Sequence, residues 1–150
     1  MKQLLILLTI LVTSIASFAQ NKDHIVWKFE AKKKSATEYE IVITATVDKP
    51  WHIYSQHSGK EGPIPTSFMF KKNPLITLSG KTLEKGNMEK SYDDLFKTQV
   101  IHFNNTVVFT QVVKLKAPVK TTFSGVVDYM LCNDRECTPP TKKSFEITLP

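Results

Sequence analysis

The sequence predicts an all-β fold, an antiparallel β-sandwich of immunoglobulin type, on three observations. Apolar residues alternate with polar or β-branched residues in short runs, the period-two pattern of strands with one buried face. Clusters of Pro, Gly, Asn and Asp separate these runs. Beyond the N-terminal apolar stretch no run shows the periodicity of an amphipathic helix. Many short strands at this spacing favour a sandwich, and closure into an up-and-down barrel is the alternative.

The first two expected strands show the alternation most clearly. Residues 25–31 carry Ile, Trp, Phe and Ala at every second position, and residues 39–47 carry Tyr, Ile, Ile, Ala and Val in the same way. Six further runs are expected to be strands: residues 51–54, 66–70, 99–103, 107–115, 121–130 and 144–149. The chain is therefore expected to hold about eight strands and no helix.

Turn-forming residues separate these strands. Such clusters occur at residues 48–50, 58–63, 72–74, 79–80, 85–87 and 104–105, the last of which is expected to form a hairpin turn. Residues 56–65 are polar and rich in Pro and Gly, which is typical of a surface loop. Because no linker divides the chain, we expect one domain over residues 20–150.

The N-terminus has the pattern of a secretory signal peptide. Lys2 precedes an apolar run that continues through Val12, and small residues at positions 17 and 19 form a cleavage signal, which predicts a signal peptide over residues 1–19. No lipid-anchor cysteine follows the run, and no second apolar stretch is long enough to span a bilayer. The mature chain is thus expected to be periplasmic or secreted, without stable membrane insertion.

Composition excludes several classes of protein. Hydrophobic residues make up 41% of the chain, and the eight prolines are scattered, which argues against a multi-pass transporter, a coiled coil or a long disordered tail. The net charge is +6, but most lysines lie apart from one another. Such scattered charge gives little reason to expect nucleic-acid binding, and export makes it less plausible still.

The chemistry of the chain is expected at its two cysteines, Cys132 and Cys137, which have four residues between them. An exported pair is expected to form a disulfide, either as a structural bond or as a redox centre. A bond across so short a loop adds only about 2 kcal/mol on the chain-entropy model. Arg135 between the cysteines would stabilise a thiolate, whereas Asp134 and Glu136 would oppose it.

Two further features leave alternatives open. His52 and His57 flank a turn and, with the cysteines, would form a copper- or zinc-binding module. Surface histidines are the simpler explanation, because the sequence holds no short-range ligand pair such as Cys-x-x-Cys or His-x-His. Trp51 follows a turn and Phe96 lies in a polar loop, where an aromatic side chain can act as a lid or a docking anchor. A secreted binding module with a purely structural disulfide is the other alternative.

The cysteine segment resembles a known family. In residues 129–140 a strand runs into Cys132 and is followed by four residues, Cys137, one residue and Pro-Pro. This segment resembles the cysteine motif of the N-terminal periplasmic domain of the thiol:disulfide interchange protein DsbD, in which five residues separate the cysteines. Residues 47–54 are similar to an early strand of that family with aromatic residues near the active site, and residues 91–96 to its acidic and aromatic cap loop. The resemblance covers about residues 22–149.

The resemblance implies an immunoglobulin-like domain that carries electrons without a cofactor. Cys137 would form the intermolecular mixed disulfide, and Cys132 would resolve it. The remaining site positions implied by the resemblance are Phe96 as the cap aromatic that shields the pair from oxidants, Asp93 and Asp94 in the loop that holds it, and Tyr54 and His52 in the pocket.

The resemblance also implies the partners. They would be thioredoxin-fold proteins: a thioredoxin-like reductant on one side, and a disulfide isomerase or a cytochrome c maturation thioredoxin on the other. The sequence contains neither the membrane domain nor the thioredoxin-like domain of the interchange protein. We therefore expect a stand-alone version of the domain. Either a membrane electron transporter and the thioredoxin-like domain are on separate chains, or the domain serves another thioredoxin-fold partner.

Overall fold

The computed structural model describes residues 23–59 and 61–150, whose regular elements are all strands. They are β1 (Ile25–Lys33), β2 (Glu38–Val47), β3 (His52–Tyr54), β4 (Ser67–Phe70), β5 (Ile76–Asp93), β6 (Thr98–Leu115), β7 (Thr121–Tyr129), β8 (Leu131–Cys132) and β9 (Thr141–Leu149). The described ranges hold no helix that is long and apolar enough to cross a membrane. The all-β prediction is confirmed, and the predicted signal peptide lies outside the described residues.

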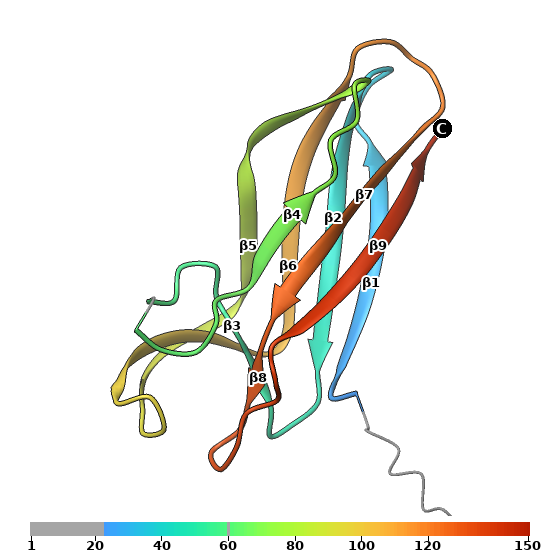
Figure 1. Ribbon diagram of the computed structural model, residues 1–150. Coiled ribbons are helices and arrows are strands. Elements are labelled where there is room, and N and C mark those ends of the chain that lie inside the picture. The colour runs from blue at the N-terminus through green and yellow to red at the C-terminus, as the bar shows by residue number, and fades with distance from the viewer. Residues whose placement is uncertain (1–22, 60) are drawn as a thin grey trace, which may run out of the picture.

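The strands form two antiparallel sheets that pack against each other (Figure 1). The larger sheet has the order β1-β2-β6-β3-β8, with β5 paired to β6 off this path, and the smaller sheet has the order β4-β7-β9. Strand β6 is the central strand of the larger sheet. It pairs with β5 along one edge of the strand, and with β2 and then β3 along its other edge. The two sheets share no ladder, so the described residues form a sandwich and not a closed barrel.

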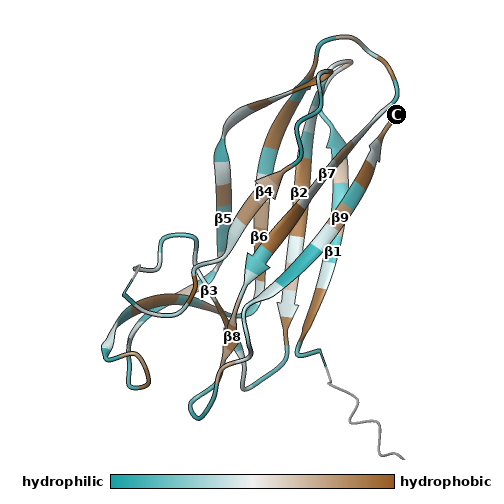
Figure 2. Cartoon of the chain, viewed as in Figure 1, coloured by the Kyte–Doolittle hydropathy of each residue, from teal (hydrophilic) through white to brown (hydrophobic). Residues whose placement is uncertain are grey.

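The main core lies between the sheets and follows the period-two pattern. Brown and paler segments alternate along β2 and β6 in Figure 2, as expected for strands with one buried face. The large sheet and the small sheet contribute, among others, Ile41, Ile43, Phe103, Phe109, Val113, Phe123, Val127, Phe145 and Leu149. Each such apolar side chain gains about 1.5–3 kcal/mol from full burial. Burial of this core therefore stabilises the sandwich, and neither cysteine belongs to it.

The prediction of turns at residues 79–80 and 85–87 is wrong, because both segments lie inside strand β5. Both segments are irregularities within one long strand, with register shifts between Ser79 and Leu83 and between Gly86 and Met88. At the first, the buried Gln111 of β6 donates from its Nε2 to the carbonyl oxygens of Ser79 and Gly80, at 3.3 and 3.4 Å. A side chain of the neighbouring strand therefore satisfies the backbone groups that the bulge frees, and the strand continues.

The prediction of a hairpin turn at Asn104-Asn105 is wrong. The two residues lie inside β6, which joins the predicted strands 99–103 and 107–115 into one. Asn105 has φ +65°, a conformation that Asn tolerates better than most residues. Opposite this point Gly86 approaches so closely that a Cβ would lie 2.8 Å from the Thr106 carbonyl oxygen. The asparagines therefore mark a distortion of β6 next to the second bulge of β5.

One end of the larger sheet carries the short strands β3 and β8 and the tip of the β5–β6 hairpin (Figure 1). Here a second, smaller apolar cluster has formed, apart from the main core. Inner positions such as Ile53 and Leu131 still belong to the main core. Because successive side chains of a strand point to opposite faces, His52, Tyr54 and Cys132 project from the other face of this sheet. The cysteines lie on that face.

Candidate functional site

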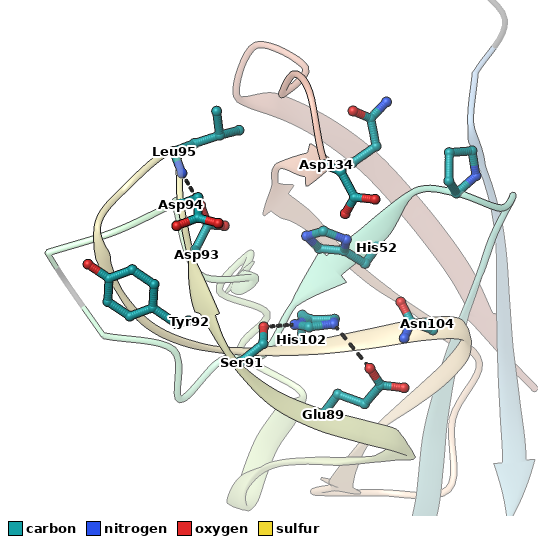
Figure 3. A pocket seen from close by; sticks show the side chains of 12 residues that line it. His52, Glu89, Ser91, Tyr92, Asp93, Asp94, Leu95, His102, Asn104 and Asp134 are labelled. Carbon is teal, nitrogen blue, oxygen red and sulfur yellow. Dashed lines mark hydrogen bonds and ion pairs between the residues drawn. The ribbon is translucent and has the colours of Figure 1, made fainter.

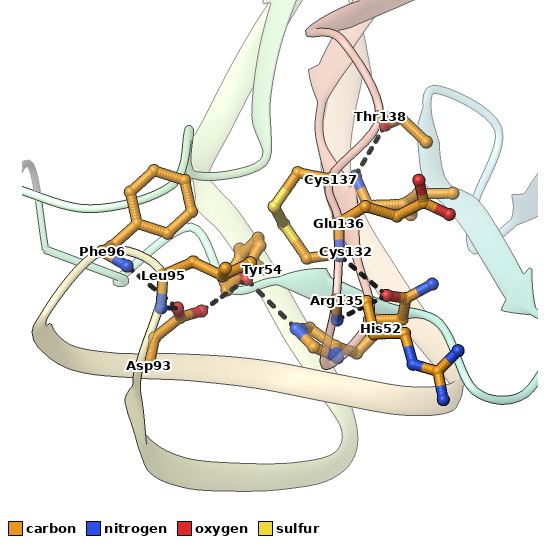
Figure 4. Close-up of a disulfide and its surroundings, with 12 residues drawn as sticks. His52, Tyr54, Asp93, Leu95, Phe96, Cys132, Arg135, Glu136, Cys137 and Thr138 are labelled. Carbon is orange, nitrogen blue, oxygen red and sulfur yellow. Dashed lines mark hydrogen bonds between the residues drawn. A yellow bond between two sulfur atoms is a disulfide. The ribbon is translucent and has the colours of Figure 1, made fainter.

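The two cysteines face each other across a tight hairpin (Figure 4). Cys132 ends β8 and is joined to Cys137 by an isolated antiparallel bridge and by a disulfide, with the Cα atoms 4.0 Å apart. Between them, Asn133 Oδ1 accepts the backbone N–H groups of Arg135 and Glu136 at 2.8 and 2.9 Å. An Asn side chain used in this way shapes its own turn. Local hydrogen bonds therefore support the hairpin in addition to the disulfide.

The two sulfur-bearing residues differ in exposure. Cys132 is completely buried, whereas Cys137 is only partly buried. The small cluster around them consists of Tyr54, Val100 and Cys132, with Phe96, Met130 and Cys137 packed against it. An attacking thiol therefore reaches Cys137 more readily than Cys132.

The turn between β5 and β6 lies beside the disulfide and carries Phe96 (Figure 4). One carboxylate organises this turn: Asp93 Oδ1 accepts the backbone N–H groups of Leu95 and Phe96 at 2.9 and 3.1 Å. The other oxygen, Oδ2, accepts the hydroxyl of Tyr54 at 3.0 Å. Asp93 thus connects the turn to β3 beneath it, and the structure brings Phe96, Asp93 and Tyr54 together with the cysteines.

Asp94 is arranged differently from its neighbour. Its carboxylate lies 3.8 Å from Lys97 Nζ, and both side chains are largely exposed. Exposed ion pairs of this kind contribute little to stability. Of the two acidic residues expected in the cap loop, only Asp93 contacts the site side of the turn through a hydrogen bond, and Asp94 lies on its surface.

His52 lies directly opposite Cys132 in the β3–β8 ladder. Its Nε2 is 3.1 Å from the hydroxyl oxygen of Tyr54. Because the single hydroxyl hydrogen of Tyr54 is donated to Asp93, this oxygen acts as the acceptor towards His52, and Nε2 carries the hydrogen. Burial, followed by the hydrogen bond to Asp93, raises the pKa of the Tyr54 phenol well above its ordinary value. The phenol therefore keeps its hydrogen at neutral pH.

His102 of β6 completes this group, and the sequence did not indicate it. The ring centroids of His52 and His102 are 4.4 Å apart. His102 Nδ1 lies 3.4 Å from Ser91 Oγ, and its Nε2 lies 3.6 Å from a carboxylate oxygen of Glu89 (Figure 3). His102 is buried, with 6% of its surface exposed.

The histidines border an open cavity of about 430 Å³ next to the cysteine hairpin (Figure 3). Its charged lining is acidic and comprises Glu89, Asp93, Asp94 and Asp134. Burial and then the proximity of His102 lower the pKa of His52 to about 4, although the carboxylates oppose this shift. Burial likewise lowers the pKa of His102. Both imidazoles are therefore neutral at pH 7.

The metal-binding alternative receives no added support from the geometry. His57 is exposed on the loop after β3, and its backbone N–H donates to Ser55 Oγ at 2.9 Å, whereas the ring of His52 lies against that of His102 at an interplanar angle of 40°. Within residues 23–59 and 61–150, no three His, Cys, Asp or Glu side chains are grouped to hold a metal ion. Trp51 is a main-core residue that stacks on His24, with ring centroids 4.3 Å apart, and so does not form a lid.

Residues 19–149 match the family model of the thiol:disulfide interchange protein DsbD, N-terminal. The chain belongs to this family. As a DsbD N-terminal domain, it has the fold expected from the resemblance. No curated protein matches the chain.

Solved structures of a ScsB and a DsbD N-terminal domain share this fold. The chain is similar to the N-terminal periplasmic domain of ScsB from Proteus mirabilis, with a TM-score of 0.64, 16% identity, and coverage of 85% of this chain and 47% of that one. It is also similar to the reduced Neisseria meningitidis DsbD N-terminal domain, with a TM-score of 0.57, 15% identity and coverage of 83% and 85%. The immunoglobulin-like sandwich is thereby confirmed. The chain spans about half the length of the ScsB structure.

The Neisseria meningitidis DsbD N-terminal domain has also been solved in a complex. The structure of the DsbD and PilB N-terminal domains from Neisseria meningitidis matches with a TM-score of 0.56 and 11% identity, and the match covers 87% of each chain. At these identities the solved structures establish the fold alone. The site of this DsbD N-terminal domain is therefore defined by the residues of this chain and not by those of the solved structures.

Proposed function

We propose that the chain is a periplasmic thiol:disulfide exchange domain that carries electrons between thioredoxin-fold partners through Cys132 and Cys137. The observation that supports this most directly is the asymmetric exposure of the pair, with Cys132 buried and Cys137 partly exposed under Phe96. Such a pair offers one sulfur to a partner and keeps the other close for resolution. Membership of the DsbD N-terminal family supports the same reaction.

The exchange needs only thiols and disulfides, because the partner's dithiol supplies both the electrons and the protons. A partner thiolate attacks Cys137 Sγ, a bond forms between the two sulfurs, the Cys132–Cys137 bond breaks, and its electron pair leaves on Cys132 Sγ. The partner's second thiolate then attacks the partner's own sulfur in the mixed disulfide and releases Cys137. The partner departs as a disulfide, the two protons of its dithiol end on the cysteines, and two electrons have been transferred. The reverse sequence reduces an acceptor disulfide.

The disulfide lies outside the main core, so its reduction should leave the sandwich folded. The cysteines contact the small cluster, whereas the main core between the sheets is made of other residues. Opening a bond that closes only a short loop removes about 2 kcal/mol on the chain-entropy model. A carrier must remain folded in both redox states, and this arrangement provides for that.

Phe96 and its turn would control access to the pair. Phe96 packs against the cluster that contains the disulfide, and Asp93 fixes the turn through its three hydrogen bonds. Opening of the turn would uncover Cys137 to a docked partner, whereas the closed turn would shield the pair from small oxidants. Asp94 would affect this motion far less than Asp93, because its ion pair is exposed.

The partner class follows from the chemistry and from the family. Thioredoxin-fold proteins present a dithiol or disulfide in a form that a pair of this kind can exchange with. A DsbD N-terminal domain forms a complex with the PilB N-terminal domain, and the ScsB N-terminal domain is periplasmic. Under this proposal a thioredoxin-like reductant, supplied by a membrane electron transporter, feeds the pair. Disulfide isomerases or cytochrome c maturation thioredoxins then receive the electrons.

The reduction potential of the pair tests the proposal. The purified chain is equilibrated with glutathione or dithiothreitol buffers, and the thiols are counted by alkylation and mass. An exchange protein is expected to give about −270 to −120 mV and to stay folded when reduced. A potential below about −300 mV, or unfolding on reduction, would identify a structural disulfide and refute the proposal.

A trapping experiment tests the assigned roles. The Cys132→Ser variant keeps the accessible Cys137 and should accumulate a mixed disulfide with a purified thioredoxin-fold protein supplied as its disulfide. Cys137→Ser is the matched control, because its remaining sulfur is buried, and it should trap little. Equal trapping by both variants would contradict the assignment of Cys137 as the attacking cysteine.

A further inference from the structure

The burial of Cys132 poses a problem for the exchange reaction. When Cys132 resolves a mixed disulfide on Cys137, its thiol must lose a proton, because the thiolate is the nucleophile. Burial in apolar surroundings disfavours the thiolate and so raises the pKa of such a thiol. Cys132 is completely buried, and Val100 and Tyr54 are its buried neighbours in the small cluster. A base next to Cys132 would remove this obstacle.

His52 is the basic side chain best placed for this task. It is the register partner of Cys132 across β3 and β8, and side chains directly opposite each other have Cβ atoms about 4.5–5.5 Å apart. The Tyr54 hydroxyl has already donated its hydrogen to Asp93. Arg135 belongs to the exposed part of the hairpin, and its guanidinium points away from the disulfide (Figure 4). The carboxylates near His52 are Asp93, Glu89 and Asp134.

The hydrogen bonds around His52 leave it in the form that a base requires. Its Nε2–H donates to Tyr54, which donates to Asp93, so the lone pair of the neutral ring is on Nδ1. Once Nδ1 accepts a proton, the positive charge is stabilised through Tyr54 by the carboxylate of Asp93. Burial and then the neighbouring His102 lower the pKa of the ring and keep it neutral beforehand, and a negative charge developing on Cys132 favours the protonated ring.

We propose that His52 accepts the proton of the Cys132 thiol when Cys132 resolves the mixed disulfide, and that Tyr54 and Asp93 position His52 for this step. The proposal rests on the proposed exchange function and adds the group that handles the proton. The proton passes from Cys132 Sγ to His52 Nδ1, and Cys132 Sγ attacks Cys137 Sγ. The new intramolecular disulfide forms, and the partner's sulfur leaves with its electron pair as a thiolate. His52 then returns the proton to water in the adjoining cavity.

Two-phase kinetics with Ellman's reagent separate this step from the first attack. The reduced chain first attacks the reagent through Cys137 and releases one coloured thiolate. Cys132 then resolves the mixed disulfide and releases a second. In His52→Gln the first phase should keep its rate, whereas the second should slow at least about 10-fold, since a general base contributes about 10²–10⁴-fold in favourable cases. His57→Gln, which alters an exposed histidine of the next loop, should match the wild type in both phases.

The pH dependence of the second phase distinguishes a base from a packing residue. With His52 in place, the rate should level off once the imidazole is neutral, whereas in His52→Gln it should keep rising with pH until Cys132 itself ionises. Tyr54→Phe keeps the imidazole and removes its hydrogen-bond partner, and should slow the second phase by an intermediate factor. An unchanged second phase in His52→Gln, or an equal slowing of both phases, would overturn the proposal. Release of only one thiolate by the wild type would instead refute the exchange function.

Discussion

Replacement of Asp93 by Ala should open the turn over the disulfide. The substitution removes two hydrogen bonds to backbone N–H groups within the turn and one from Tyr54. A typical hydrogen bond contributes about 1 kcal/mol net, so the closed turn should lose up to about 3 kcal/mol. Because Asp93 is only half-buried, water replaces part of each bond. A loss of about 1–3 kcal/mol corresponds to about 5- to 150-fold in the open-to-closed ratio.

The rate of disulfide reduction measures this ratio. If small thiols reach Cys137 only in the open form, the rate is proportional to the open population. Wild type, Asp93→Ala and Asp94→Ala are mixed with dithiothreitol, samples are quenched by alkylation, and reduced chains are counted by mass. Asp93→Ala should react about 5- to 150-fold faster. Asp94→Ala should remain within about twofold of the wild type, since its ion pair is exposed. Equal rates for the two variants would refute the assignment of Asp93 as the residue that holds the turn.

Three further outcomes are expected. Phe96→Ala should also accelerate reduction by dithiothreitol, and an unaltered reduction rate would show that the ring does not shield the disulfide. Because Phe96 is half-buried, the same substitution should lower the free energy of unfolding by only about 1–2 kcal/mol. The pKa of His52 falls from 6.5 to about 4 on folding, so the contribution of the neutral imidazole to stability is complete above pH 6.5 and is lost as the pH falls through 4. The melting temperature should therefore drop less across this pH range in His52→Gln than in the wild type. Parallel curves of melting temperature against pH for the two proteins would contradict the lowered pKa. Gly86→Ala brings a Cβ to 2.8 Å from the Thr106 carbonyl oxygen and should destabilise the chain by about 1–3 kcal/mol in urea unfolding. Gly59→Ala, with no atom within 4 Å of the new Cβ, should be nearly neutral, and equal losses would exclude the steric cause.

The parts of the fold predicted from the sequence are those that depend on local alternation. Residues 25–31 and 39–47 form strands with the expected buried faces, and the two-sheet arrangement followed from the number and spacing of such runs. The prediction failed where a long-range contact changes the meaning of a local signal. Ser79-Gly80 is typical of a turn, yet Gln111 from the adjacent strand satisfies its carbonyl groups and β5 continues.

The site shows the same division. The sequence placed the chemistry at Cys132 and Cys137 because they are the two cysteines of the chain, and the resemblance supplied Phe96, Asp93 and Tyr54, which the structure brings together. His102 was missed because its place beside His52 depends on the register of β6 against β3. The one available signal was the period-two spacing from Val100, which puts His102 on the face opposite to Phe103.

Strand β6 serves both apolar clusters with neighbouring side chains. Phe103 enters the main core, while Val100 enters the cluster around the disulfide. A residue inserted or deleted between these positions would exchange the two faces and would damage the scaffold and the site together. Divergent relatives should therefore vary the length of the turn at residues 94–97 but keep the residue count of β6 from Val100 to Phe103. Spacing along this strand is thus expected to be under stronger selection than the identity of most residues within it.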